Sequence, residues 1–380
     1  MNFEPSEDQK LLRDMIRDFA ESEIGPQVKE LEEKREFPHH ILRKLGQLGI
    51  MGMNVPAEYG GSKTDALSNI IVFEELGRLS PAISVIVSVH CSLFCYSIWK
   101  YGTDRQKAKY LPAAAKAEIL GAFSITEPEA GSDVMALKTR ARRDGDFYVL
   151  NGTKAWVTSG GEAGALIVFA VTEKDRSLKK LSAFIVENTF PGFKVTKIEK
   201  KMGLHSSHTA ELTLEDCRVP AENLLGEEGK GAAIALHCLD YSRIGIAAQA
   251  VGLSQKALEE GLKYAKQREA FGKKIADFEA VQFMLADSAT ELDAARFLTY
   301  RAADLFDRGR PFSKEAAMAK LFATEAANRI VYKALQIHGG YGYSSEFEIE
   351  RLYRDARVTT IYEGTSEIQR LVIARNLLKE

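Results

Sequence analysis

The sequence predicts an α+β multidomain fold with three parts: an N-terminal helical domain over residues 1–120, a middle antiparallel β-barrel-like domain over 121–227, and a C-terminal four-helix bundle over 228–380. Apolar residues recur at helical spacing in the first and last parts, whereas short runs rich in Val, Ile, Phe and Tyr, separated by turn residues, fill the middle. A chain of 380 residues also exceeds the usual size of one hydrophobic core. We therefore expect packed units that share buried surface.

The first part opens with a helix signature. Ser6 and Gln9 have the spacing of a capping box, and apolar residues follow at helical intervals. Similar patterns continue over 41–48, 70–79 and 83–101. No apolar run reaches the roughly 18 residues of a membrane-spanning helix, so we expect no membrane association.

Turn dipeptides divide the middle part. Asp144-Gly145 and Asn151-Gly152 are typical of hairpin turns, so we expect antiparallel strands on either side of each. The expected strands cover residues 147–150, 155–158, 165–171 and 181–186.

Helical periodicity returns from about residue 228. One long pattern runs over 313–338 and ends at Gly339, a residue that commonly terminates helices. Four or so long helices, each with an apolar stripe, would pack as an antiparallel bundle.

Composition excludes several classes of function. Lys and Arg total 51 against 53 Asp and Glu, so the net charge of −2 provides no field for nucleic acid or an anionic membrane. Four scattered cysteines indicate a reducing compartment, either bacterial cytoplasm or the mitochondrial matrix of a eukaryote. His90, Cys91 and Cys95 are expected to pack in the core and not to bind metal. The sequence has neither a P-loop nor a glycine fingerprint for a nicotinamide cofactor.

Several polar residues occur where chemistry or simple packing could explain them. The turn-forming stretch 127–132 can offer free backbone N–H groups to a heterocycle or to phosphate oxygens, or can serve as an interdomain turn. Trp156 and Thr158 lie two apart in an expected strand and would project from one face, where they could contact one ring system or pack in the core. Arg268 and Phe271 lie about one helical turn apart, so a guanidinium group and an aromatic ring could bind a ligand together. A surface salt bridge of Arg268 is the simpler alternative.

Two charged residues stand in apolar surroundings. Arg243 begins an apolar helical run and therefore needs a carboxylate or a ligand as its partner, while Asp240 could cap that helix. Glu363 follows Ile361 and Tyr362 and precedes Gly364, a combination that can bury a carboxylate while keeping the backbone close to a ligand. Most lone glutamates are solvated, but burial would raise the pKa of Glu363 and make it a suitable general base.

Four segments, in this order, resemble the signatures of the acyl-CoA dehydrogenase family, and the resemblance extends over the entire chain. They are Phe123–Asp133, Arg268–Gly272, Gln336–Gly342 with the following Glu346, Arg351 and Asp355, and Ile361–Glu367. Ser124 departs from the family pattern, which more often has Ala, Gly or Cys there.

The resemblance implies an FAD site, a substrate site and partner proteins. The residues that it assigns to FAD are Phe123, Ile125, Thr126, Ser132, Trp156, Thr158, Arg268, Phe271, Gln336, Gly339, Gly340, Thr365 and Glu367. Those that it assigns to the acyl-CoA substrate are Ser132, Asp240, Arg243 and Gly364. It also implies that Arg268 reaches FAD across a subunit interface of a homotetramer, and that an electron-transferring flavoprotein accepts the electrons.

The function implied is a step of fatty acid β-oxidation. A short- to medium-chain saturated acyl-CoA would become a trans-2-enoyl-CoA, with Glu363 taking the α-proton and flavin N5 taking the β-hydride. Some family members carry the base beside the Arg243 equivalent, where this sequence has Ser242, so the short- and medium-chain arrangement fits better. The apolar residues Leu93, Phe94, Tyr96 and Ile98 suggest a pocket of limited depth. Two alternatives stay open: a same-fold acyl-CoA oxidase and a flavin-binding relative that dehydrogenates nothing.

Overall fold

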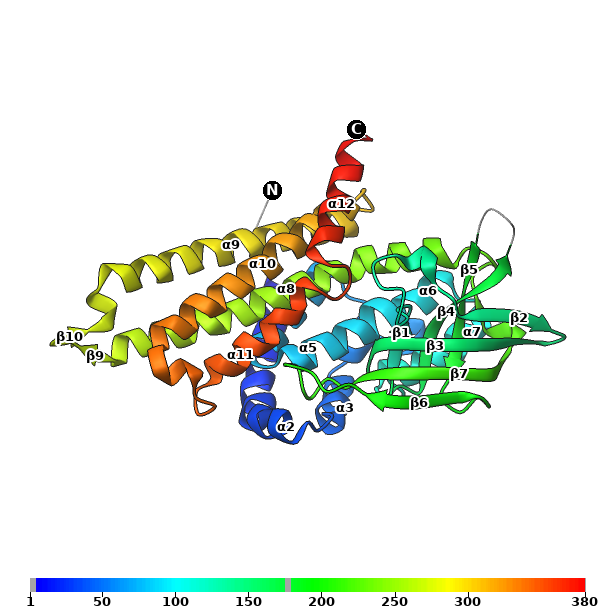
Figure 1. Ribbon diagram of the computed structural model, residues 1–380, viewed down its shortest axis with the longest axis horizontal. Helices are drawn as coiled ribbons and strands as arrows, with labels where there is room; N and C mark the ends of the chain where they lie inside the picture. Colours follow the sequence, from blue (N-terminus) through cyan, green and yellow to red (C-terminus); the bar gives the residue numbers. More distant parts are fainter. Residues whose placement is uncertain (1–4, 175–178, 380) are drawn as a thin grey trace.

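The computed structural model describes residues 5–174 and 179–379. The strands of the middle part gather at one end of an elongated molecule, and three long helices extend to the other end (Figure 1). The shorter N-terminal helices pack between the sheet and the long helices (Figure 1). The predicted succession of a helical, a β and a second helical part is confirmed.

The N-terminal helices follow one another closely. Their bounds are α1 Glu7–Phe19, α2 Val28–Lys34, α3 His39–Gln47, α4 Ala66–Leu79, α5 Pro81–Ser88, α6 Tyr96–Tyr101 and α7 Asp104–Ala115. The capping box before α1 is confirmed, because Ser6 Oγ accepts from Gln9 N at 3.2 Å and Gln9 Oε1 accepts from Ser6 N at 3.0 Å.

The prediction that no apolar run is long enough to span a membrane was wrong for one stretch. Pro81–Tyr101 joins α5, the π-helical segment Val89–Cys95 and α6, and it could cross a bilayer by length and composition. Almost all of it is buried inside the protein, as expected of a core helix. Buried His90 lies in this stretch and accepts from Gly121 N through Nδ1 at 2.9 Å, so it packs in the core. No group of three or more potential metal ligands occurs among the described residues.

The middle part forms one mixed sheet. Its strands are β1 Gly121–Ser124, β2 Arg140–Asp144, β3 Phe147–Thr158, β4 Ala165–Lys174, β5 Lys179–Glu187, β6 Phe193–Ile198, β7 Thr209–Pro220 and β8 Leu224–Leu225. The strand order is β6-β7-β3-β2-β4-β5-β8, with β1 paired to β4. The sheet is not wholly antiparallel as predicted, since β1 and β2 both run parallel to β4.

One predicted turn is absent. The hairpin at Asp144-Gly145 joins β2 to β3 as expected, but β3 continues straight through Asn151-Gly152. Strand β3 pairs with β2 on one side and with β7 on the other, and the register shift at Asn151-Gly152 arises because β7 has one extra residue between Leu214 and Cys217. Pairing with two neighbouring strands therefore overrides the local turn preference.

Strand β4 is buried on both faces. Ile167 and Phe169 belong to a core shared with the helices, whereas Leu166 and Val168 belong to a second core inside the β domain. Alternate residues of a strand point to opposite faces, so this strand lies between the two cores. The adjacent β1, which carries Phe123, is thereby fixed at the boundary between the sheet and the helices.

Long helices make up the C-terminal part. Their bounds are α8 Gly231–Gln267, α9 Glu279–Asp307, α10 Ser313–His338, α11 Glu348–Ala356 and α12 Ser366–Leu377. Helix α10 has the predicted bounds, ends at Gly339, and packs against α8, α9 and α12. Helix α4 lies very close to α8, because a Cβ at Gly252 would be 2.0 Å from Glu74 O.

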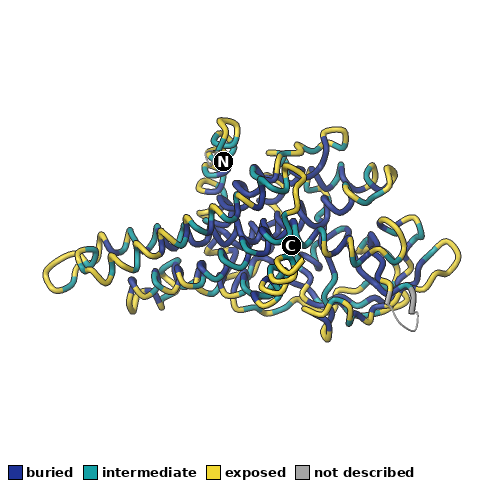
Figure 2. Tube along the Cα trace, turned by 90° about the horizontal axis from the view of Figure 1, so that it is seen from above, coloured by how far each residue is buried: buried dark blue, intermediate teal, exposed yellow. Residues whose placement is uncertain are grey.

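A small hairpin joins α8 to α9 at the end of the molecule remote from the sheet. It consists of β9 Glu269–Ala270 and β10 Lys273–Lys274. Figure 2 shows this tip as exposed chain.

A histidine pair ties the N-terminal helices to the β domain. Glu162 accepts from His208 Nδ1 at 2.7 Å and lies 3.0 Å from His39 Nε2, while His208 Nε2 lies 2.9 Å from Arg35 O. The hydrogen bond with Glu162 is the main reason why the pKa of His208 is raised. The raised pKa means that the folded state holds this proton more tightly than the unfolded chain does.

We expect this contact to stabilise the protein most at low pH. Its contribution is fully present below about pH 6.5, the unfolded value for histidine, and is lost as pH rises through the higher folded-state pKa. The wild-type holoprotein should therefore melt at a higher temperature than the His208→Gln variant at pH 5.5, and this difference in melting temperature should become smaller towards pH 8.5. Exposed His40 forms a hydrogen bond with the Gln27 side chain and not with a carboxylate of the described residues, so His40→Gln serves as the control. Parallel wild-type and His208→Gln curves would contradict this assignment.

Candidate active site

The loop that carries Glu363 connects the turn Arg357–Thr360 to α12. Thr365 caps α12 by accepting from Ile368 N at 3.4 Å, and its hydroxyl lowers the pKa of exposed Glu367. Gly364 has φ +93°, and a Cβ there would be 2.7 Å from Gln369 Nε2. The loop therefore requires glycine after the glutamate, for both backbone conformation and space.

The Glu363 carboxylate has one buried oxygen and only one hydrogen bond to the described residues. Its Oε2 accepts from Ser242 Oγ at 2.5 Å. The residue as a whole is partly exposed, but Oε1 is buried and has no hydrogen-bond partner among the described residues. Burial raises the pKa of Glu363, opposed by Ser242, Lys320 and Arg243 in that order. One carboxylate oxygen is therefore free to accept a proton.

Three helices hold the backbone of this loop. Glu363 O accepts from Arg243 Nε of α8 at 3.4 Å and from Gln369 Nε2 of α12 at 3.3 Å. Gly364 O accepts from Gln369 Nε2 at 2.8 Å and from Lys320 Nζ of α10 at 2.9 Å. The Glu363 N–H has no partner among the described residues, which leaves it available to a ligand.

Two further contacts brace the same loop. Arg243 is buried and its Nη1 donates to Asp240 Oδ1 at 2.5 Å, so the carboxylate partner expected for this arginine is Asp240. The Tyr362 hydroxyl donates to Gln249 Oε1, and Gln249 Nε2 donates to Pro81 O at 2.6 Å. The loop is thereby linked through α8 to the N-terminal helices.

A second group of predicted residues meets in the β domain. Ala155 N donates to Thr126 O at 2.9 Å, which brings Trp156 of β3 beside the loop that follows β1. Trp156 is 60% exposed and Thr158 is partly exposed, while Val157 between them is buried. A register shift between Lys154 and Val157 and a φ of +57° at Trp156 interrupt the regular strand alternation that the prediction assumed. Phe123 is buried, Ile125 and Thr126 are partly buried, and Ser132 is exposed.

A buried ion pair holds the loop of this second group. Lys154 Nζ donates to Glu127 Oε1 at 2.9 Å and to Ile125 O at 3.2 Å. Glu127 also accepts from Lys138 N at 2.6 Å and Thr139 N at 2.9 Å. Burial lowers the pKa of Lys154 to about 8, an effect that Glu127 opposes. The pair fixes the backbone at Ile125.

The third group lies at the far end of the molecule. Arg268 ends α8 with its guanidinium 6.0 Å from the Tyr341 ring centre, and exposed Phe271 follows in the β9–β10 hairpin. Gln336, Gly339 and Gly340 are exposed at the end of α10. One chain does not bring this group together with the β-domain group, because the two lie at opposite ends (Figure 1).

Backbone strain occurs in all three groups. Trp156, Phe271 and Glu363 have φ values of +57°, +51° and +50°, which are uncommon for non-glycine residues. Such conformations cost energy and are concentrated at functional sites.

The residues predicted to hold FAD fit a bound flavin nucleotide. Trp156 and Phe271 expose 60% and 96% of their surface, so large aromatic faces are left uncovered by this chain. The hydroxyls of Ser124 and Ser159, beside the predicted flavin residues, are buried and have no partner among the described residues. Uncovered aromatic faces and unpaired polar atoms are what a large heterocyclic ligand would satisfy.

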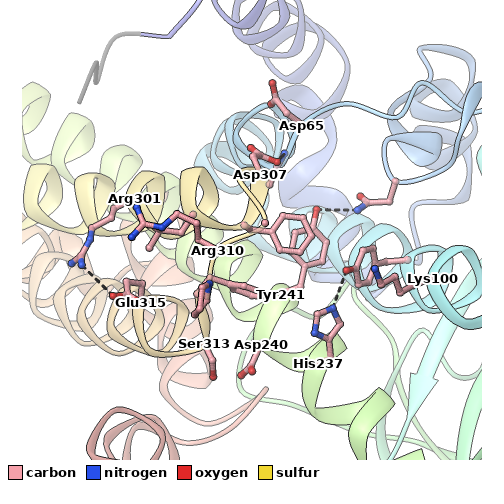
Figure 3. Close-up of a pocket in the computed structure, with 18 of the residues that line it drawn as sticks. Asp65, Lys100, His237, Asp240, Tyr241, Arg301, Asp307, Arg310, Ser313 and Glu315 are labelled. Carbon is pink, nitrogen blue, oxygen red and sulfur yellow. Dashed lines mark hydrogen bonds and ion pairs between the residues drawn. The ribbon is translucent and has the colours of Figure 1, made fainter. Parts of the chain in front are cut away.

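A cavity of about 1220 Å³ has Asp240, one of the predicted substrate residues, in its wall. Asp240, Tyr241 and His237 of α8 line it, together with the chain between α9 and α10 (Figure 3). Its wall mixes basic residues such as Lys100 and Arg310 with carboxylates, and Glu363 is not part of the lining. The cavity wall therefore includes one predicted substrate residue, Asp240, and its lining includes no residue of the loop that carries Glu363.

Sequence reasoning missed several residues of the site. Ser242 was considered only as a position without a base, yet it donates to the Glu363 carboxylate. Lys320 and Gln369, which bind the Gly364 carbonyl, were not predicted at all. Lys320 has a signal in the sequence, since it is the one charged residue among the alanines Ala316, Ala317, Ala319 and Ala323.

The helical–β–helical fold, with a buried carboxylate oxygen in the C-terminal part and an exposed tryptophan on the β domain, defines a class of oxidoreductases. The chain belongs to the acyl-CoA dehydrogenase family. The family models of the N-terminal, middle and C-terminal domains of acyl-CoA dehydrogenases match residues 6–118, 122–217 and 229–378.

Curated relatives match over the full length. An acryloyl-CoA reductase (NADH) of Anaerotignum propionicum is 48% identical over 381 residues, which cover 100% of this chain and 96% of the relative. A short-chain specific acyl-CoA dehydrogenase of Clostridium acetobutylicum is 45% identical over 379 residues and 100% of both chains.

Solved structures agree with this family. A chain from work on the electron transferring flavoprotein of Acidaminococcus fermentans has a TM-score of 0.98 and 46% identity over 100% of both chains. Butyryl-CoA dehydrogenase from Megasphaera elsdenii has a TM-score of 0.97 and 42% identity, again over 100% of both. Acyl-CoA dehydrogenase complexed with FAD from Bacillus anthracis has a TM-score of 0.94 and 36% identity over 99% of this chain and 68% of that one. The protein is an FAD-dependent oxidoreductase.

Proposed function

We propose that this protein dehydrogenates short-chain acyl-CoA thioesters between the α- and β-carbons, with Glu363 as the general base. The observation that carries the proposal is the Glu363 carboxylate with its raised pKa, together with its buried Oε1 and the N–H of the same residue, neither of which has a hydrogen-bond partner in the described part of the chain. The short-chain preference is supported by the butyryl-CoA and short-chain specific relatives.

The loop geometry suits removal of an α-proton. The Glu363 N–H donates to the thioester carbonyl oxygen and stabilises the negative charge that develops there, a type of donor effect worth about 10²–10³ in rate. Oε1 accepts the α-proton while Ser242 holds Oε2 in place. The electrons of the α C–H bond form the new double bond as the β-hydrogen leaves with its own pair. FAD, when bound, supplies the acceptor for that hydride.

Placement of the cofactor is part of the proposal. Phe123, Ile125, Thr126, Trp156 and Thr158 would hold the flavin end, since the ion pair of Glu127 and Lys154 fixes this loop. The remote group of Arg268, Phe271, Gln336, Gly339 and Gly340 would serve the FAD of another subunit, because it lies at the opposite end of this chain (Figure 1). A homotetramer would provide that arrangement. The work on an electron transferring flavoprotein that includes a similar chain supports such a protein as the electron acceptor.

We expect anaerobic butyryl-CoA to bleach the oxidised-flavin absorbance of the holoprotein. Electrons leave a saturated substrate only if the α-proton and β-hydride are both removed. Butyryl-CoA should act faster than octanoyl-CoA and palmitoyl-CoA, and free CoA should have no effect. Absence of bleaching with every saturated acyl-CoA, while FAD is bound, would refute the proposed function. Steady peroxide formation in air would identify an oxidase instead.

Reduction of an enoyl-CoA is the second candidate function. The raised pKa of Glu363 also favours its protonated form, which could return a proton to the α-carbon. The acryloyl-CoA reductase among the relatives supports this direction. Oxidation of NADH on addition of acryloyl-CoA, measured at 340 nm with a turnover number of about 1–10³ s⁻¹, would favour the reductase over the dehydrogenase.

A further inference from the structure

A buried lysine lies behind the base loop. Lys320 of α10 is 0% exposed and is surrounded along its helix by the buried residues Ala316, Ala317, Ala319 and Ala323. Lysine is almost never fully buried unless its charge is paired. The reaction proposed above gives Lys320 no chemical step, so its burial needs another explanation.

The ammonium group of Lys320 is attached to the loop through one carbonyl. Its Nζ donates to Gly364 O at 2.9 Å, an oxygen that already accepts from Gln369 Nε2 at 2.8 Å. Among the described residues no carboxylate lies within ion-pair distance of Nζ. A neutral side chain could donate a second hydrogen bond to the Gly364 carbonyl without the cost of burying a cation. The hydrogen bond alone therefore does not explain why this residue is a lysine.

The charges facing Lys320 come from three other elements as well as its own helix. Burial lowers the pKa of Lys320 to about 7, an effect that Glu363 opposes most strongly. Arg243 of α8 reinforces the lowering, whereas Glu325 of α10 and Glu367 of α12 oppose it. Arg243 is itself paired with Asp240. Reciprocally, Lys320 and Arg243 oppose the rise that burial causes in the pKa of Glu363.

We propose that Lys320 is a positioning residue for the catalytic base: it fixes the Glu363–Gly364 peptide through the Gly364 carbonyl, and its charge keeps the buried Glu363 carboxylate ionised. The inference rests on the proposed role of Glu363. Ser242 and Lys320 have different roles. Ser242 orients the Glu363 carboxylate by a direct hydrogen bond, whereas Lys320 binds the backbone carbonyl of the next residue, Gly364.

The test is the pH dependence of kcat/KM for butyryl-CoA in holoprotein with Lys320→Met. The acid limb of this profile reports the ionisation of the base in the free enzyme. Loss of a neighbouring positive charge raises a carboxylate pKa by about one unit or more, so the limb should move to higher pH by that amount. On the limb, kcat/KM should fall about tenfold. Lys320→Arg, which keeps the charge and the donors, should return the limb towards the wild-type position.

A third variant and a control separate charge from general disruption. Lys320→Gln keeps a hydrogen-bond donor but has no charge. The acid limb of its pH profile should therefore shift as far as that of Lys320→Met, while its kcat on the plateau above the limb should stay closer to the wild-type value. Thr324, also buried on α10, donates to Lys320 O and Leu321 O of its own helix, and Thr324→Val, which changes no charge, should leave the limb in place. FAD content and melting temperature identify variants that fail to fold.

An unchanged acid limb in FAD-loaded Lys320→Met and Lys320→Gln would overturn the inference. That outcome is distinct from failure of the proposed function, which Glu363→Gln tests independently. If Glu363→Gln is inactive and the limb of both Lys320 variants is unmoved, only the role of Lys320 is refuted.

Discussion

Replacing Glu363 by Gln should lower turnover with butyryl-CoA by at least about 10²–10⁴, the usual contribution of a general base. The amide has nearly the same shape and can still accept from Ser242, but it cannot take a proton from carbon. FAD content and the affinity for a non-reacting acyl-CoA analogue should stay close to wild type. Single-turnover flavin reduction measures the chemical step directly.

The matched control is Glu291→Gln. Glu291 is a partly buried carboxylate of α9 that contacts Arg329 and Lys333 of α10. Loss of a carboxylate at this position should leave the rate of flavin reduction close to that of wild type, because the partners of Glu291, Arg329 and Lys333, lie outside the loop that carries Glu363. If Glu363→Gln reduces flavin as fast as Glu291→Gln, another residue must be the base.

Replacing Lys154 by Met should destabilise the β domain strongly. The change leaves the buried Glu127 carboxylate without its cation, and breaking a buried ion pair in this way costs about 3–5 kcal/mol. Lys154 also holds Ile125 O, so the holoprotein should lose FAD more readily. Urea denaturation followed by circular dichroism and by flavin release measures both effects.

Two comparisons make this prediction specific. The double variant Glu127→Gln with Lys154→Met removes both charges and should recover much of the lost stability, because no unpaired charge remains. Lys194 pairs with Glu215 on the surface, where both side chains are exposed, and Lys194→Met should change stability by no more than about 0.5 kcal/mol. Equal stability and FAD retention in Lys154→Met and Lys194→Met would contradict a structural role for the buried pair.

Local patterns in the sequence predicted the elements whose signals are local. The capping box at Ser6 and the end of α10 at Gly339 depend on residues within a turn or two, and both were predicted correctly. The turn at Asn151-Gly152 was predicted wrongly, because β3 continues through it to pair with β2 and β7. Strand partners distant in the sequence decided that position.

The residues of the active site could be predicted only where they belong to a recognisable sequence motif. The motif resemblance supplied Glu363, and the apolar run after Arg243 indicated that this arginine needs a carboxylate partner, now seen as Asp240. The contacts that shape the base come from Ser242, Lys320 and Gln369 on three different helices. Their convergence depends on tertiary packing, which no spacing along the chain encodes.

The two-sided burial of β4 limits how this protein can be divided. Cutting the chain between the β domain and its neighbours would expose Ile167 and Phe169 to water, since they pack into the core shared with the helices. The three parts can therefore be distinguished in the sequence, but they share a hydrophobic core and are not expected to fold independently of one another. A chimera that exchanges the middle part between relatives would keep its shape only if the helical side chains facing β4 were exchanged with it.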